Sequence, residues 1–193
     1  MPAKLKETRR RIIDAAYALF YKEGFAHVSV DAIAAAAGFT KRTLYYHFQS
    51  KDALVAEVLA AQHHLMLGQI AGWVSHASGD PETMVGIMFS EMGVWARKPG
   101  WRGSGFTRAA MEFARSPGHP ARKAARRHKA EVEVLLAQQF ADQGVAASAS
   151  LVRQIVMLIE GCNVLMLIHG DPSYALEAEA AAKLLVRRHT ADR

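Results

Sequence analysis

The segment 40–51, which reads TKRTLYYHFQSK, places two tyrosines, a histidine and a phenylalanine in a row between cationic side chains. Tyrosine hydroxyls, histidine and lysine donate hydrogen bonds to phosphate oxygens, and side chains in the first turn of a helix can reach the edges of bases. A segment this short cannot bury all four rings. The residue types therefore favour contact with a phosphate-lined duplex, although a half-buried surface helix would also contain them.

Helical spacing separates this segment into a buried face and an exposed face. Leu44 and Phe48 are four residues apart, so they share one side of a helix and can pack on a core. The other side chains form rows on the remaining sides: Lys41 with Tyr45, Arg42 with Tyr46, and Thr43 with His47. The two apolar residues are expected to hold the helix while the cations and phenols face outward.

This helix is expected to be the second helix of a helix-turn-helix. Ser29 suits the N-cap of a short helix over VDAIAAAA, Asp31 favours its first turn, and Gly38 ends it. Thr40 suits the N-cap of the next helix. A longer helix over about 8–23 would supply the core on which both pack, formed by Ile12, Ala16, Leu19 and Phe20 together with Ile33.

Positive charge is concentrated in the first quarter of the chain. The protein has 193 residues and a formal net charge of +6. Residues 1–51 carry nine Lys or Arg and four Asp or Glu, which gives this segment +5 and leaves +1 for all the rest. This asymmetry indicates a polyanionic partner for the N-terminal part.

The remainder continues in the same helical pattern, and the predicted fold class is all-α with about nine helices. Further helices are expected over about 50–74, 81–97, 104–115, 120–143, 149–169 and 173–189, separated by glycine and proline. No secretory signal is visible and a single cysteine suits a reducing compartment, so we expect a cytoplasmic protein. Polar side chains interrupt the apolar stretch 151–169, which favours a buried helix over a membrane span.

The stretch 151–169 has two apolar faces, and a helix that is apolar on two sides must be covered on two sides. One cover can come from the same chain and the other from a second copy in a C2 homodimer. Burial of both faces inside a monomer is the alternative. The candidate dimer interface, which includes small residues of the last helix, is Leu151, Ile155, Leu158, Cys162, Leu165, Ala178, Ala182 and Leu185.

A stripe of methionines and aromatic residues is the candidate ligand site. Methionine adapts to irregular apolar shapes, so the stripe could line a cavity for an apolar or aromatic small molecule, and ordinary core is the alternative. Glu91 and Glu112 are candidate polar anchors, or else surface or helix-pair residues. The candidate ligand-binding residues are Met88, Met92, Trp95, Trp101, Phe106, Met111 and Met166.

The sequence gives little sign of a catalytic, metal-binding or redox site. No Ser-His-Asp order, carboxylate pair or glycine-rich phosphate loop stands out, so we expect neither an enzyme nor a cofactor. His63 and His64 are adjacent and cannot point the same way from a helix, which argues against a metal site, and His119 and His128 are isolated. Cys162 lies among apolar residues and is expected to be a buried thiol.

The pattern over residues 8–62 closely resembles the N-terminal domain of TetR-family transcriptional regulators. The matching features are I-x-x-A-A-x-x-L-F, G-F-x-x-V-S-V-D-A-I-A-A-A-A-G, and T-K-R-T-L-Y-Y-H-F followed by S-K-D-A-L. The resemblance implies a DNA-binding domain over 6–52, with its helix-turn-helix at about 29–48, and a helical effector-binding and dimerisation domain over 53–193. The DNA-binding residues that it implies are Ser29, Lys41, Arg42, Thr43, Tyr45, Tyr46, His47 and Lys51.

The sequence therefore predicts a homodimeric transcriptional repressor that binds a palindromic, double-stranded operator and is released by a small apolar or aromatic ligand. Two alternatives remain open. One is an α-helical enzyme or carrier with an incidental basic N-terminus, which would show no salt-dependent binding to a duplex. The other is a DNA binder without an effector, which would show equal affinity for all sequences. The choice between repressor and activator also remains open.

Overall fold

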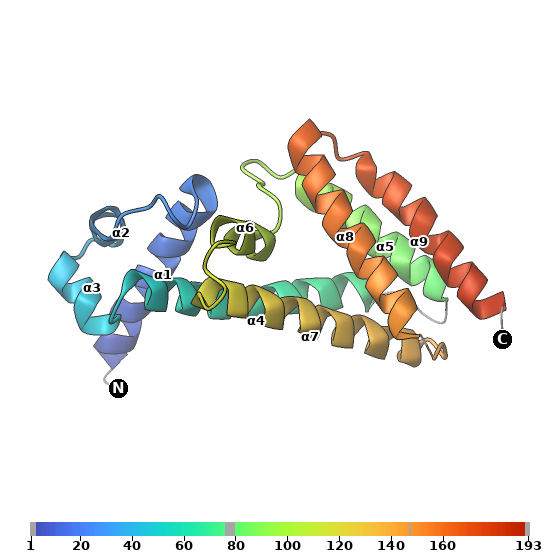
Figure 1. Cartoon of the computed structure of the whole chain (residues 1–193), viewed down its shortest axis with the longest axis horizontal. Coiled ribbons are helices and arrows are strands. Elements are labelled where there is room, and N and C mark those ends of the chain that lie inside the picture. The colour runs from blue at the N-terminus through green and yellow to red at the C-terminus, as the bar shows by residue number, and fades with distance from the viewer. Residues whose placement is uncertain (1–2, 76–79, 147, 192–193) are drawn as a thin grey trace. The chain divides into compact units, whose positions relative to one another are not determined.

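The computed structural model describes residues 3–75, 80–146 and 148–191. Over these ranges it contains nine helices and no strand, which confirms the all-α prediction. The helix that the sequence predicts from about residue 8 begins earlier, at Ala3. The helices are α1 (Ala3–Glu23), α2 (Val30–Ala37), α3 (Lys41–His47), α4 (Lys51–Val74), α5 (Pro81–Ala96), α6 (Gly105–Glu112), α7 (Pro120–Asp142), α8 (Ala149–His169) and α9 (Tyr174–Ala191) (Figure 1).

The chain divides into two compact units. The first contains the residues up to His64 together with Gly105–His128, and the second contains Leu65–Ser104 together with the chain from Lys129 onward. Helix α6 and the first parts of α4 and α7 therefore belong with the three N-terminal helices. The domain boundary that the sequence predicts at residues 52–53 lies within the first of these units.

Local caps determine where α2 and α3 begin and end. The Ser29 hydroxyl oxygen accepts the N–H of Ala32 at 3.1 Å, which satisfies a backbone donor that the first turn of α2 leaves unpaired. Gly38 closes α2 with a φ of +74°, a left-handed conformation that glycine adopts without strain. The Thr40 hydroxyl oxygen accepts the N–H of Thr43 at 3.1 Å and caps α3, which begins at Lys41, three residues after Gly38.

Burial of one face of α3 holds it in the first unit. Leu44 is fully buried and Phe48 is 3% exposed, as the helical spacing predicts. Helix α1 contacts α2, and α2 contacts α3. Burying an aliphatic or aromatic side chain contributes about 1.5–3 kcal/mol, so these two residues are a large part of what fixes such a short helix. The other buried side chains of these helices include Ile12, Ala16, Phe20 and Ile33, whereas Leu19 is only half-buried.

In the second unit, α9 packs against both α5 and α8 (Figure 1). Small residues permit the close approach of α5 and α9, because a Cβ added at Gly93 would lie 3.2 Å from the Cβ of Ala175. Among the described residues, α8 alone has the length and apolarity of a membrane span. Its buried side chains, from Leu151 to Met166, belong to the core of this unit, as expected of a core helix.

Candidate DNA-binding interface

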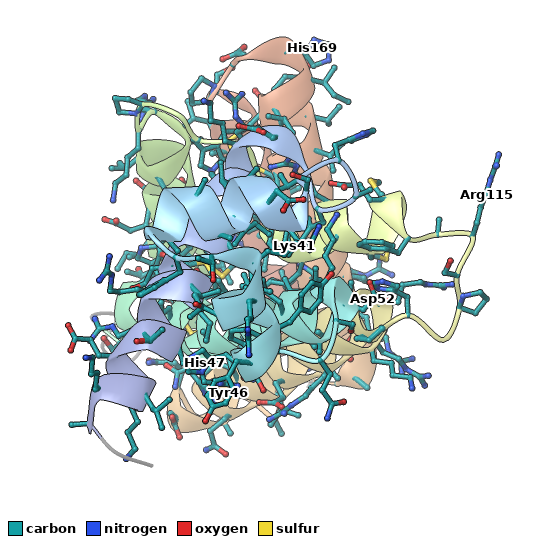
Figure 2. The ribbon with its side chains drawn as sticks, turned by 90° about the vertical axis from the view of Figure 1, so that its left-hand side faces the viewer. Lys41, Tyr46, His47, Asp52, Arg115 and His169 are labelled. Carbon is teal, nitrogen blue, oxygen red and sulfur yellow. The ribbon has the colours of Figure 1, made fainter. Side chains whose placement is uncertain are left out.

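The outward face of α3 carries the residues that the sequence selects for DNA contact. Tyr46 is 74% exposed, Tyr45 is 46% exposed, and the Lys41 and Arg42 side chains are also exposed. Figure 2 shows Lys41, Tyr46 and His47 on the side turned toward the viewer. The division into an apolar inner face and a cationic, phenolic outer face therefore agrees with the helical spacing.

Several N-terminal cations have structural partners. The Arg9 guanidinium forms an ion pair with Glu57 at 2.9 Å. The Arg11 guanidinium donates to the backbone carbonyl of Ala37 at 3.0 Å and so ties α1 to the end of α2. The net charge of this segment therefore overstates the number of cations that are free to meet phosphates.

The adjacent cations Lys41 and Arg42 differ in whether a partner within the described chain holds them. The Lys41 ammonium donates to the Asp31 carboxylate at 2.9 Å, and this hydrogen bond is the main reason that the pKa of Lys41 lies above its ordinary value. In the part of the chain that the structure describes, no hydrogen bond or ion pair holds the Arg42 guanidinium. Arg42 is therefore the cation of the first turn of α3 that is free to reach a base edge.

A groove of about 530 Å³ lies between the amino end of α1 and the outer face of α3. The sequence assigns no role to the α1 residues that line it, although Lys4 and Thr8 are four residues apart and share a helix face. Cationic and hydroxyl groups line the groove together with rings, a combination suited to a sugar-phosphate strand. Its lining is Lys4, Leu5, Thr8, Phe39, Thr40, Arg42, Thr43, Tyr46 and His47.

Two further predicted contacts already have hydrogen bonds within the chain. The Ser29 oxygen accepts a backbone N–H, and its own O–H remains a donor for a phosphate. The Lys51 ammonium donates to the carbonyl of Ala26 at 2.7 Å, and burial lowers the pKa of Lys51 below its ordinary value. Lys51 thus holds the turn between α1 and α2, and its contact with DNA stays a prediction.

The candidate ligand residues do not form one cluster. Met88, Met92 and Met166 are buried in the core of the second unit, with Trp95 and Trp101 half-buried beside other aromatic side chains. Phe106 belongs to the first unit, where it stacks on the His128 ring at a centroid distance of 3.8 Å.

Met111 is 64% exposed and does not share a face with Phe106. Five residues of α-helix rotate a side chain by about 140° from its starting direction, so a five-residue spacing is not a helical stripe. The Glu112 carboxylate accepts the N–H of Ala26 at 2.8 Å, so Glu112 connects α6 to the turn between α1 and α2.

Most of the candidate dimer residues pack within the chain itself. The core of the second unit covers most, but not all, of the two apolar faces of α8. Leu158 and Leu185 are partly buried against the same core, and Leu165 is 38% exposed. The candidates that this core buries, and that are not available to a second subunit, are Leu151, Ile155, Cys162, Ala178 and Ala182.

A different apolar stripe lies exposed on the last two helices. Met157 and Ile168 of α8 are 70% and 67% exposed, and Leu176 and Leu184 of α9 are each 62% exposed. Residues 157, 161, 165 and 168 follow helical spacing, as do residues 176, 180 and 184. Apolar side chains that recur on one face at this exposure favour contact with another protein surface.

The N-terminal part of the chain is similar in sequence to known proteins. A family model described as bacterial regulatory proteins, tetR family, matches residues 12–58. The chain is 44% identical over 62 residues to the HTH-type transcriptional regulator TtgW of Pseudomonas putida, a match that covers 32% of this chain and 46% of TtgW. It is 42% identical over 62 residues to SrpR of Pseudomonas putida, covering 32% and 29% of the two chains. These matches span less than half the length of either relative.

Solved structures match over nearly the whole chain. A TetR-family transcriptional regulator from Streptomyces coelicolor, SCO4454, has a TM-score of 0.81 and 26% identity, covering 94% of this chain and 89% of that chain. The reduced form of Escherichia coli NemR has a TM-score of 0.81 at 16% identity, covering 92% and 95%, and shows a shared fold. The family match falls on α1–α3 and on the beginning of α4, so the N-terminal part of this chain is similar to the tetR family of bacterial regulatory proteins, and the whole chain shares the fold of TetR-family regulators.

Proposed function

We propose that this protein is a cytoplasmic transcriptional regulator, a homodimeric repressor that binds a palindromic operator and is released by a small apolar or aromatic ligand. The observation that carries the proposal is the outer face of α3, where Arg42 and the exposed Tyr46 border the groove. Arg9 and Arg11 are held by partners inside the chain, whereas the Arg42 guanidinium has none among the described residues.

The DNA contacts follow from the chemistry of each group. The Arg42 guanidinium can donate two hydrogen bonds to O6 and N7 of a guanine in the major groove. Tyr46 and Ser29 can donate O–H groups to phosphates, and Lys4 adds a charge on the far side of the groove. Lys41 can leave Asp31 for the DNA, because exposed ion pairs are weak.

The exposed stripe of Met157, Ile168, Leu176 and Leu184 supports the dimer. In a C2 dimer the same stripe faces itself, so apolar side chains on α8 and α9 would cover one another. Two recognition helices would then read half-sites whose centres lie one DNA turn apart, about 34–36 Å, or a multiple of this.

Helix α6 contacts the helices α1–α3, which we call the head. The Arg108 guanidinium donates to the carbonyl of Tyr21 at 2.7 Å, and Glu112 accepts from Ala26, so α6 holds the turn between α1 and α2. A ligand that prefers one arrangement of α4 and α6 would shift the population of DNA-binding states by its difference in affinity. The same ligand would be bound less tightly by the operator complex.

Titration of promoter-derived and random duplexes at two salt concentrations tests the proposal. We expect the promoter-derived duplex to bind more tightly, with affinity that falls as salt rises. Arg42→Ala should weaken specific binding by about 1–3 kcal/mol and reduce the preference for one sequence. Lys22→Ala, which removes the same charge from an exposed position on α1, is the matched control and should change little. Equal affinity for all duplexes would contradict specific regulation.

A further inference from the structure

The buried polar atoms of the second unit that lack a hydrogen-bond partner in the described parts of the chain include the indole nitrogen Nε1 of Trp101 and the amide oxygen Oδ1 of Asn163. Asn163 is 7% exposed and lies on the same face of α8 as Ile159 and Met166, which are apolar and buried. An unpaired buried donor or acceptor destabilises a folded protein, so such atoms are retained where something else binds them.

The segment that follows α5 brings these two residues into one region. A Cβ added at Gly103, two residues after Trp101, would lie 3.8 Å from the Asn163 carbonyl oxygen and 3.4 Å from Leu167 Cδ2. Gly103 has a φ of +72°, which lets the chain turn closely against α8 without strain. Trp101 itself packs against the same core as Met166.

A second contact holds the same segment to α8. The Lys129 ammonium lies 2.5 Å from a carboxylate oxygen of Glu160 and 3.4 Å from the Ser104 hydroxyl oxygen. Glu160 is three residues before Asn163 on α8, so the ion pair borders the region on one side. Lys129 and Glu160 neutralise each other, so this ion pair adds no net charge beside a ligand.

Indole rings form the apolar part of the region. Trp101 meets Trp95 edge to face with 5.7 Å between ring centroids, and Trp95 lies 6.2 Å from Trp73. Aromatic rings in such arrangements accept a further ring in the same edge-to-face or offset geometry. The region therefore combines aromatic surface with a hydrogen-bond donor and an acceptor that the described residues leave free.

We propose that Trp101 and Asn163 are the polar anchors of the effector site, and that the effector is an uncharged aromatic molecule carrying a hydroxyl or amide group. This deepens the proposed function and rests on it. The Trp101 N–H donates to the oxygen of the effector, and Asn163 Oδ1 accepts its O–H or N–H. A carboxylate or ammonium is disfavoured, because it would lose its hydration without gaining an opposite charge.

The experiment compares three probes of one shape on the full chain without DNA: 2-naphthol, naphthalene and 2-naphthoate. Calorimetry and thermal shift should show 2-naphthol binding about tenfold more tightly than either of the others, a difference of about 1.4 kcal/mol. Preference for 2-naphthoate, equal binding of all three, or no binding of 2-naphthol up to its solubility limit would each overturn the proposal.

Two variants assign the hydrogen bonds. Asn163→Leu and Trp101→Phe, which keep apolar bulk, should each weaken 2-naphthol binding about tenfold and leave naphthalene binding unchanged. Gln138→Leu removes an exposed amide from α7 of the same unit and is the matched control, expected to bind 2-naphthol as the wild type does. Unchanged 2-naphthol affinity in Asn163→Leu would refute the anchor.

The melting temperature separates this role from a structural one. Since Asn163 Oδ1 has no partner among the described residues, Asn163→Leu without ligand should melt no lower than the wild type. A markedly lower melting temperature would mean that the amide serves the fold, and the inference would fail. Operator binding is measured separately, so a protein that binds the operator but not 2-naphthol refutes only this inference, and one that binds no operator refutes the proposed function.

Discussion

Leu44 and Tyr46 lie two residues apart in α3 and have opposite environments. Leu44 is fully buried and Tyr46 is 74% exposed. Two positions of an α-helix differ by about 200° in direction, so neighbouring residues of one short helix can serve the core and the surface separately. The stability of the head and its affinity for DNA can therefore be changed independently.

Leu44→Ala should lower the free energy of unfolding by about 2–5 kcal/mol, because it leaves a cavity where α3 packs on the core of the head. Tyr46→Ala should change it by less than about 0.5 kcal/mol, because an exposed ring makes few contacts in the free protein. Urea titration followed by circular dichroism measures both. Operator binding should weaken in Tyr46→Ala although its fold is intact. Unfolding of the head in Tyr46→Ala would contradict this assignment.

The packing of two helices depends on how closely their backbones can approach each other. Gly93 of α5 faces Ala175 of α9, and a Cβ at Gly93 would lie only 3.2 Å from the Ala175 Cβ. Gly68 of α4 has nothing within 4 Å of the same added atom in the described structure. Substituting alanine at each of these two glycines therefore separates the effect of helix packing on stability from the effect of intrinsic helix propensity.

Gly68→Ala should raise the free energy of unfolding by about 0.5–1 kcal/mol, because alanine loses less conformational entropy than glycine in a helix. Gly93→Ala should lower it by about 1 kcal/mol, because the crowding of α9 outweighs that gain. Thermal and urea unfolding of the two variants, side by side, measure the difference. Equal stabilisation by both substitutions would show that α5 and α9 are not tightly packed at Gly93.

An ion pair also connects α5 to α9. Arg187 donates to both carboxylate oxygens of Glu82, at 2.6 Å from Nη2 and 3.1 Å from Nε, and this is the main reason that the pKa of Glu82 lies below its ordinary value of 4.5. A carboxyl whose pKa is lower in the folded state stabilises that state above its unfolded pKa. The contribution is lost as the pH falls through the folded pKa.

Glu82→Gln should therefore reduce the loss of melting temperature on acidification below pH 4.5, relative to the wild type. Near neutral pH the variant should melt slightly lower, because the ion pair is absent. Melting curves recorded from neutral pH down to about pH 3 measure both effects. Parallel curves for the two proteins would show that this ion pair does not contribute to the pH dependence.

At the scale of the whole molecule, the proposed dimer needs the exposed stripe of α8 and α9. Leu184→Glu places a charge where two copies would bury a leucine, so it should convert dimers to monomers in sedimentation equilibrium. Operator affinity should fall together with dimerisation, because a monomer reads only one half-site. Val134→Glu changes a similarly exposed residue of α7, at 69% against 62% for Leu184, and should leave the dimer intact. An unchanged mass for Leu184→Glu would refute the assigned interface.

Much of the head could be predicted from the sequence because its signals are local. Ser29, Gly38 and Thr40 act within a few residues of their own positions, and the four-residue spacing of Leu44 and Phe48 determines the buried face. The dimer interface stays a prediction. Periodicity shows that α8 is apolar on more than one side, but it does not show which side its own chain covers.

The sequence by itself determined the helices of the described ranges, the helix-turn-helix and the outward face of α3, because hydrogen bonds and side-chain rows within a helix connect residues four apart or fewer. Only the tertiary structure decided which cations and rings are free. It paired His63 with His128, 65 positions apart, at 3.1 Å between their Nδ1 atoms, and within the described chain it left the Asn163 amide oxygen without a hydrogen-bond partner. Such pairings depend on how distant helices pack, and no local spacing encodes that packing.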